Sequence, residues 1–180
     1  RDLLDELLYQ SKKYIDLMIT QPMLDLVLHL IQRFLEDEHK LLLRRQKKGF
    51  VLETHGAFVP EHLYLKGSEV LAVSPLVGTH KFRTLDAAND PACFVNALLL
   101  ASQDEMADLF IKRYASAAKD RDVAHLLPLY QTLQALRGGL LHSERQATPR
   151  LDDATRQIEV ELAKSYYTLA VRVSRVIGKT

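Results

Sequence analysis

Apolar residues recur at helical spacing along most of the chain, and this periodicity predicts a mainly α fold. Residues 91–101 are apolar nearly all round, which is typical of a buried helix. Pro22 and Pro91 suit the first turn of a helix, and we expect Asp90 to cap the helix that Pro91 opens. The other stretches with a helical pattern are 2–19, 23–46, 104–118, 123–136 and 152–177.

Two features weaken the helical pattern in the second half of the chain. Pro128 lacks a backbone donor, so we expect a helix start or a kink close to it. The Gly138-Gly139 pair is expected to weaken any continuation beyond residue 136, because glycine has a low helix propensity. In the last helix, the residues expected on the apolar side are Ile158, Leu162, Tyr166, Leu169, Val173 and Val176.

The stretch 50–74 is the one part of the chain that favours β-structure. Val51–Thr54 is apolar and rich in β-propensity, and His55-Gly56 ends this run. Two further apolar runs flank the turn Lys66-Gly67-Ser68, and an irregular loop is expected after the second one. The pattern predicts a strand just before His55 and a hairpin over 62–73. In a helical protein, a loop placed before such a hairpin is a common position for function.

The order of residues in this stretch resembles the catalytic loop and metal-binding hairpin of bacterial aminoglycoside-phosphotransferase-like kinases. In that family the loop is His-Gly-Asp-Leu-His-x-x-Asn-Ile, followed by a hairpin that ends in Asp. His55 and Gly56 match it. The catalytic Asp position holds Ala57, and the two magnesium-binding positions hold His62 and Ser74. The resemblance therefore implies the helical C-lobe of a protein-kinase-like fold, catalytically degenerate, with one small β-hairpin.

Flanking segments extend the resemblance from about Arg44 to Leu141. The basic run 44–48 and Gly49 resemble the family's helix end, although the residues alone predict a solvated helix end. The stretch 82–92 is similar to the family's Phe-Arg-x-x-Asp-x-x-x-Asp-Leu-Ala segment. An Asp of that segment braces the catalytic loop in the family by accepting backbone hydrogen bonds. This implies a structural brace at Asp86 or Asp90, which capping by Asp90 would also explain.

The family's nucleotide-binding N-lobe has no counterpart in this sequence. A length of 180 residues suits one domain, which we expect to span residues 1–180. The chain starts at Arg1 and not at Met, which suggests a fragment of a longer protein.

The residues at the degenerate positions do not fit phosphoryl transfer. Ala57 has no group that accepts a proton, and Ser74 is a poor ligand for magnesium, which prefers charged oxygens. His62 suits softer metal ions. We therefore expect a binding or scaffolding module of the pseudokinase type, with no metal site and no cofactor. The alternative is an active small-molecule phosphotransferase in which Glu53 or Glu61 supplies a relocated carboxylate.

A second alternative rests on Arg137 and His142. An Arg, four residues and a His resemble the motif of HEPN-type ribonucleases, which are small helical bundles. Those domains lack a central β-hairpin, and the glycine pair inside the motif would weaken its helix. The hairpin expected over 62–73 therefore favours the kinase-like interpretation.

Composition constrains the environment of the protein more than its mechanism. Hydrophobic residues make up 47% of the chain and the net charge is +1, so no global charge favours a nucleic acid or an anionic membrane. The single cysteine, Cys93, is expected in the core, and it fits a reducing compartment. We see no signal peptide and no membrane-spanning run. We therefore expect a cytoplasmic module, and the resemblance to bacterial aminoglycoside-phosphotransferase-like kinases implies a bacterial one. Its expected partner is a protein or the rest of its own longer chain, not a nucleic acid or a membrane.

Overall fold

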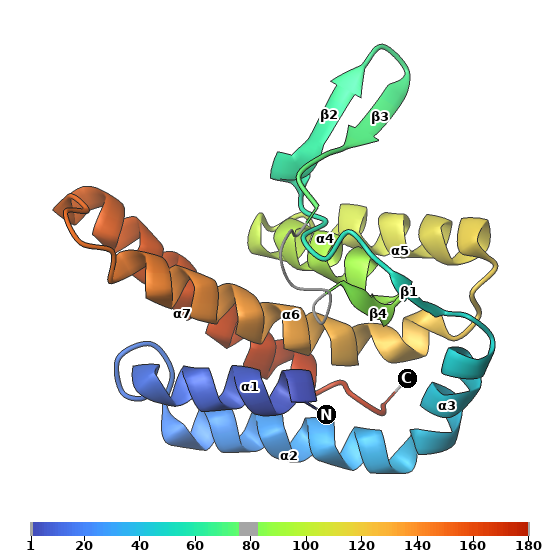
Figure 1. Ribbon diagram of the computed structural model, residues 1–180, viewed down its shortest axis with the longest axis horizontal. Helices are drawn as coiled ribbons and strands as arrows, with labels where there is room; N and C mark the ends of the chain where they lie inside the picture. Colours follow the sequence, from blue (N-terminus) through green and yellow to red (C-terminus); the bar gives the residue numbers. More distant parts are fainter. Residues whose placement is uncertain (1, 76–82, 180) are drawn as a thin grey trace.

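The computed structural model describes residues 2–75 and 83–179, without the side chains of residues 2 and 3. Within this part, seven α-helices and two small antiparallel two-stranded sheets confirm the prediction of a mainly α fold with one small hairpin (Figure 1). The helices are α1 (Asp2–Ser11), α2 (Gln21–Asp37), α3 (His39–Lys47), α4 (Asn89–Leu100), α5 (Asp104–Ala118), α6 (Val123–Gln146) and α7 (Asp153–Ser174).

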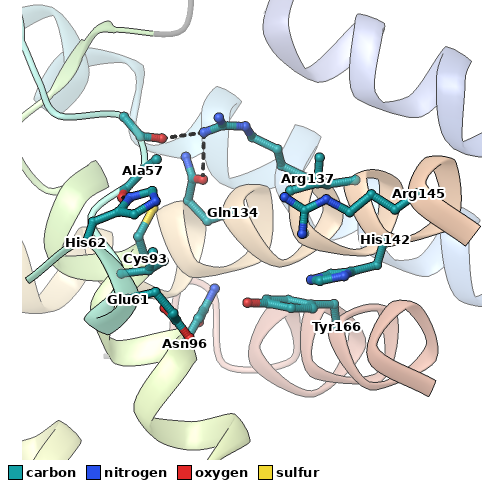
Figure 2. Close-up of a pocket in the computed structure, with 14 residues that line it drawn as sticks. Ala57, Glu61, His62, Cys93, Asn96, Gln134, Arg137, His142, Arg145 and Tyr166 are labelled. Atoms are coloured by element: carbon teal, nitrogen blue, oxygen red, sulfur yellow. Dashed lines mark hydrogen bonds between the residues drawn. The ribbon is translucent and has the colours of Figure 1, made fainter. Parts of the chain in front are cut away.

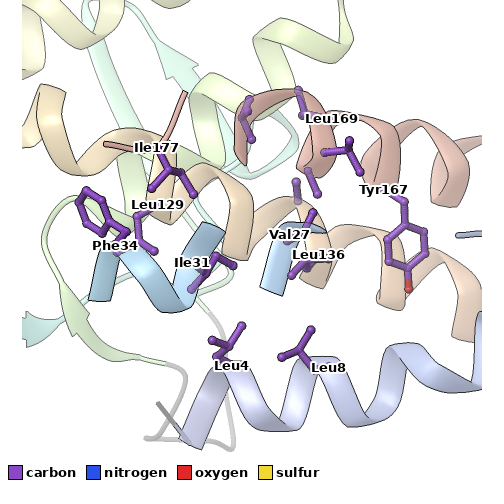
Figure 3. Close-up of a cluster of buried hydrophobic side chains, with 14 of the residues drawn as sticks. Leu4, Leu8, Val27, Ile31, Phe34, Leu129, Leu136, Tyr167, Leu169 and Ile177 are labelled. Atoms are coloured by element: carbon purple, nitrogen blue, oxygen red, sulfur yellow. The ribbon is translucent and has the colours of Figure 1, made fainter. Parts of the chain in front are cut away.

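Helices α6 and α7 form the centre of the molecule and pack side by side. Helices α1 and α2 cover one side of this pair, and α4 and α5 lie on the other side, where α4 contacts α6 (Figure 1). The main core fills the space between α1, α2, α6 and α7 (Figure 3). Its buried residues include Leu4, Leu8, Val27, Ile31, Phe34, Leu129, Leu136, Tyr167, Leu169 and Ile177. In the described part of the chain, no helix is both long and apolar enough to cross a lipid bilayer.

The Gly138-Gly139 pair does not end α6, contrary to the weakening expected from propensity. A Cβ atom added at Gly138 would lie 2.5 Å from the ring of Tyr166, and one at Gly139 would lie 2.9 Å from the ring of Tyr167. Both contacts are shorter than carbon atoms tolerate. The two glycines therefore let α7 approach α6 closely, and this tertiary packing outweighs the low helix propensity of glycine.

The buried face of α7 is rotated from the one that the periodicity predicts. Leu169 and Val173 are buried as expected, but Ile158 is 58% exposed. The side turned to the core instead carries Ala163, Tyr167, Ala170, Val171 and Ser174. This face is buried because small residues and the Tyr167 ring fit against α6, whereas Ile158 lies beyond the core.

Two predicted helices are interrupted in the structure. The first helix ends at Ser11 and is followed by a 3₁₀ turn, and Asp16 has a left-handed φ of 63° that an α-helix cannot contain. The second is divided at Glu38 into α2 and α3. The Glu38 carboxylate accepts a hydrogen bond from His125 Nε2 of α6 at 2.9 Å, which holds the break against the core.

The helix start considered at Pro128 is not observed, because α6 begins at Val123 and continues through the proline. As the sixth residue of the helix, Pro128 removes a single intrahelical donor, to the carbonyl group of Ala124. The Pro128 carbonyl still accepts a hydrogen bond from Thr132 Oγ1 at 2.7 Å.

The predicted hairpin is formed by β2 (Leu63–Lys66) and β3 (Glu69–Ala72). Gly67 takes a φ of +62° in its two-residue turn, a conformation that glycine adopts without strain. The hairpin projects away from the helices (Figure 1), and Leu65 is 81% exposed. The strand before His55 is β1 (Val51–Glu53), and it pairs with β4 (Thr84–Asp86), which the sequence analysis did not foresee. Except for Pro75, the irregular loop expected over 75–79 lies outside the described residues.

The basic run at the end of α3 is not a fully solvated helix end, because Arg45 is 1% exposed. Its guanidinium group forms paired hydrogen bonds of 2.7 Å with the carboxylates of both Asp86 and Asp120, and it stacks 4.1 Å from the Phe50 ring centroid. Burial alone would lower the pKa of Arg45, but the hydrogen bonds to the two carboxylates outweigh it and raise the pKa. This buried cluster fixes the end of α3 against β4 and the end of α5.

We predict that Gly139→Ala destabilises the protein by about 1–3 kcal/mol, because the new methyl group meets the buried Tyr167 ring. Helix propensity alone would predict a gain of about 1 kcal/mol. Urea unfolding measures the difference. The control is Ser116→Ala on the exposed face of α5, which should raise stability slightly, by up to about 0.5 kcal/mol, because it changes helix propensity without a steric contact. Equal or higher stability of Gly139→Ala would show that the close approach of α7 does not require glycine.

Candidate functional site

The loop between β1 and β2 carries most of the positions singled out by the kinase resemblance. It begins at Thr54, includes His55, Gly56 and Ala57, and ends in a 3₁₀ turn over Pro60–His62. Gly56 has a φ of +73°, so the chain turns here in a conformation that favours glycine. The position of Ala57 therefore follows from the sharp turn just before it.

Two helices hold the peptide groups of Gly56. The Asp90 carboxylate, on the first turn of α4, accepts hydrogen bonds from the backbone N–H of His55 at 2.7 Å and of Gly56 at 2.9 Å. The Arg137 guanidinium, on α6, donates to the Gly56 carbonyl oxygen. Arg137 also donates to the Gln134 side chain at 3.3 Å. The backbone of the loop is therefore attached to the helical core by charged side chains on both sides.

The two loop histidines bind backbone carbonyl groups. His55 Nε2 donates to the Val73 carbonyl at 2.9 Å, and His62 Nδ1 donates to the Ala57 carbonyl at 2.8 Å. The Val73 N–H in turn donates to the His62 carbonyl at 2.9 Å. These bonds connect the loop to the base of the hairpin. Ser74 follows directly, with a left-handed φ of 58°.

Asp86 and Asp90 have different contacts. Asp90 does not cap α4 as predicted, because the helix begins at Asn89 after Ala88, and the Asp90 carboxylate is turned toward the loop. Asp86 binds Arg45, and it also accepts a hydrogen bond from the backbone N–H of Ala88 at 2.9 Å. The hydrogen bond from the Ala88 N–H to Asp86 fixes the turn before α4 without a cap from Asp90.

A cavity of about 300 Å³ opens between the loop, α4, α6 and α7 (Figure 2). It brings together residues that the sequence analysis assigned to two different hypotheses, because Ala57 and His62 line it together with Arg137 and His142. Its volume is at the lower end for sites that bind small molecules. The other residues of its wall are Gly56, Val59, Glu61, Cys93, Asn96, Gln134, Gly138, Leu141, Arg145 and Tyr166.

The wall formed by α6 and α7 has a fixed geometry. His142 Nδ1 donates to the Glu159 carboxylate at 2.6 Å, and its ring stacks on Tyr166 with centroids 5.3 Å apart. Gly138 faces the same Tyr166 ring and leaves the space that the ring occupies. Burial, followed by the charge of Glu61, raises the pKa of Tyr166, so its hydroxyl stays protonated and can donate a hydrogen bond.

The described residues of the cavity provide neither a reactive thiol nor a metal-binding centre. Burial raises the pKa of Cys93 to about 12, so this thiol is neutral at physiological pH and is not a nucleophile. Burial lowers the pKa of Arg137, but a guanidinium group remains charged in proteins. Within residues 2–75 and 83–179, no three His, Cys, Asp or Glu side chains gather where they could hold one metal ion.

Of the two carboxylates considered as relocated ligands, the structure brings only Glu61 to the cavity. Glu53 lies on β1 and forms an ion pair with Arg83, and its side chain is largely exposed. Ser74 is not part of the cavity wall either. The degenerate positions are therefore divided between the cavity and the base of the hairpin.

Several residues of the wall were not singled out from the sequence. A signal did exist for Arg145, because residues 137, 141 and 145 share one face of a helix at a spacing of four. Asn96 and Tyr166 offered no such signal, since they come from α4 and α7 and meet only through tertiary packing. Gln134 is buried and donates to the Asn89 side chain at 2.6 Å, a contact across 45 residues.

Comparisons with protein-family models, curated proteins and solved structures found no match to this chain. The geometry of the loop and its cavity therefore carries the functional argument.

We predict that Asp90→Ala lowers the free energy of unfolding by about 1–3 kcal/mol, because two backbone N–H groups of the loop lose their acceptor. Urea unfolding measures the loss. Asp104→Ala is the matched control, since Asp104 is an exposed acidic residue in the first turn of α5 and tests the helix-dipole effect alone. An equal loss in both variants would mean that the loop hydrogen bonds contribute nothing to stability.

Proposed function

We propose that this chain is a binding module of the pseudokinase type, in which a kinase-like loop forms one wall of a ligand cavity and no phosphoryl transfer takes place. The observation that carries the proposal is the attachment of the Gly56 peptide groups to Asp90 and Arg137. A loop held this firmly beside an open cavity fits a binding site, because a fixed wall reduces the entropy lost when a ligand binds.

The residues next to this fixed backbone argue against phosphoryl transfer. Transfer needs a group that orients the attacking oxygen and carboxylates that hold magnesium. Ala57 supplies no such group. The His62 ring donates to the Ala57 carbonyl and so closes the loop. Ser74 has a left-handed backbone, a conformation that Asp also tolerates, but its side chain is a hydroxyl and not a carboxylate. The side chains at these positions therefore do not fit the family's chemistry.

The alternative of an active small-molecule phosphotransferase now depends on Glu61. It is the one carboxylate among the described residues of the cavity wall, and a single carboxylate among neutral and cationic side chains is a weak site for magnesium. The ion pair between Glu53 and Arg83 takes the second candidate away from the cavity.

The HEPN-type ribonuclease remains a second candidate because Arg137 and His142 both line the cavity. Each has a structural contact that competes with catalysis. Arg137 donates to the Gly56 carbonyl, and His142 donates to Glu159. These contacts favour a role for both residues in shaping the cavity.

We predict that the unmodified chain does not bind ATP in the presence of magnesium. Isothermal titration calorimetry with magnesium and ATP should show no binding at micromolar concentrations. The physical reason is the lack of a magnesium cage around Ala57, His62 and Ser74. An oligoribonucleotide incubated with the same protein should remain intact.

The variant Glu61→Gln makes this test specific. Magnesium-dependent ATP binding that disappears in Glu61→Gln would overturn the proposal in favour of a phosphotransferase with a relocated carboxylate. RNA cleavage that disappears in His142→Ala would overturn it in favour of the nuclease.

A further inference from the structure

The charges of the cavity wall are unequal in sign. Among the described residues that line it, Arg137 and Arg145 each carry a positive charge and Glu61 carries a negative charge, so the wall has a net charge of +1 with neutral histidines. The imidazoles of His62 and His142 add only neutral or positive groups.

Two further carboxylates lie behind the wall, but Asp90 accepts hydrogen bonds from the His55 and Gly56 amides and Glu159 accepts one from His142. The exposed Arg145 guanidinium is then the charged group that a ligand can reach most readily, and it favours an anion over a cation.

The two arginines differ in how firmly they are held. Arg137 is fixed by its hydrogen bonds to the Gly56 carbonyl and to Gln134, and Gln134 is itself held by Asn89. Arg145 lies two turns further along α6, is exposed, and forms no ion pair with a described residue. In Figure 2 both side chains project from α6. The cavity thus has a fixed positive charge on its wall and an adjustable guanidinium at its edge.

Neutral groups complete a site suited to an oxyanion. Guanidinium groups recognise carboxylates and phosphates through paired hydrogen bonds. The protonated Tyr166 hydroxyl and the Asn96 amide belong to the same wall, and Figure 2 shows the Tyr166 side chain beneath His142. Val59 and Leu141 supply the apolar part. A ligand with an anionic group and a compact apolar body would match both kinds of surface.

We propose that the cavity binds a small organic oxyanion, a carboxylate or a phosphate monoester carried on a compact apolar group, with Arg145 contacting the anion. This inference rests on the proposed binding function and names its class of ligand. A volume of about 300 Å³ limits the ligand to a compact molecule. A polycation is disfavoured, because it would lie against two guanidinium groups with one carboxylate to balance it.

Four probes of similar size test the charge preference by calorimetry: phenyl phosphate, benzoate, benzyl alcohol and benzylamine. We expect phenyl phosphate, benzoate or both to bind at least about tenfold more tightly than the neutral and cationic probes. The comparison of the two anions distinguishes a phosphate site from a carboxylate site. The inference is overturned if benzyl alcohol or benzylamine binds as tightly as the anions, or if neither anion binds up to about 10 mM.

Three variants locate the anion in the cavity. Arg145→Gln should weaken anion binding at least about tenfold, because it removes a charged donor from an exposed position without disturbing the core. Arg172→Gln, on the exposed face of α7 and outside the wall, carries the same change in charge and should have no effect. Glu61→Gln should strengthen anion binding about two- to fivefold by removing a like charge. Equal effects of Arg145→Gln and Arg172→Gln would overturn the assignment of the site.

The failure of this inference is distinguishable from the failure of the proposed function. Specific binding of benzylamine or benzyl alcohol that Arg145→Gln leaves unchanged would overturn the oxyanion class and leave a binding module. Magnesium-dependent ATP binding that is lost in Glu61→Gln would overturn the proposed binding-only function. The calorimetric titrations with phenyl phosphate and benzoate would still test the preference for an oxyanion separately.

Discussion

The structure of the site depends on how Gly56 is held. Its N–H donates to the Asp90 carboxylate of α4, and its carbonyl group accepts from the Arg137 guanidinium of α6. Because α4 packs directly on α6, these two side chains give the loop the rigidity of the helical core. The positive φ of Gly56 then sets where Ala57 lies, and with it one wall of the cavity.

The opposite wall is fixed by close helix packing rather than by charge. Gly138 and Gly139 bring α7 against α6, so that the Tyr167 ring enters the core while the Tyr166 ring faces the cavity. The same pair of glycines that weakens the local helix thus creates the surface on which His142 stacks. The helical core and the loop meet at Arg137, which belongs to α6 and binds the loop.

The described fold could be predicted from the sequence wherever a local pattern determined it. Helical periodicity predicted where most of the helices lie, and the turn at Gly67 predicted the hairpin, because both depend on nearby residues. The breaks after Ser11 and at Glu38, and the continuation of α6 through Gly138 and Gly139, depend on tertiary packing and were not predicted. The pairing of β1 with β4 depends on contacts across about 30 residues and had no local signal. Arg45 was expected in solvent, since a basic helix end normally is; only the arrival of Asp86 and Asp120 from distant elements makes its burial favourable.

The part of the site that lies in one short stretch of sequence was also predictable. His55, Gly56, Ala57 and His62 were found because they lie together in one loop of the sequence. Arg137 and His142 were noticed for a different motif, and nothing in their spacing indicated that they line a cavity with Ala57 and His62. That arrangement depends on the crossing of α4, α6 and α7. The resemblance to a kinase C-lobe stays a prediction.

The central claim is that the loop is a fixed wall of a binding cavity, and native-state hydrogen exchange of the His55 and Gly56 amides tests it most directly. The account predicts that both amides exchange with free energies close to that of the buried Leu136 amide in α6, since Asp90 connects them to the core. The exposed turn at Gly67 provides a fast-exchanging reference in the same experiment. Exchange of His55 and Gly56 as fast as that of Gly67 would contradict the account.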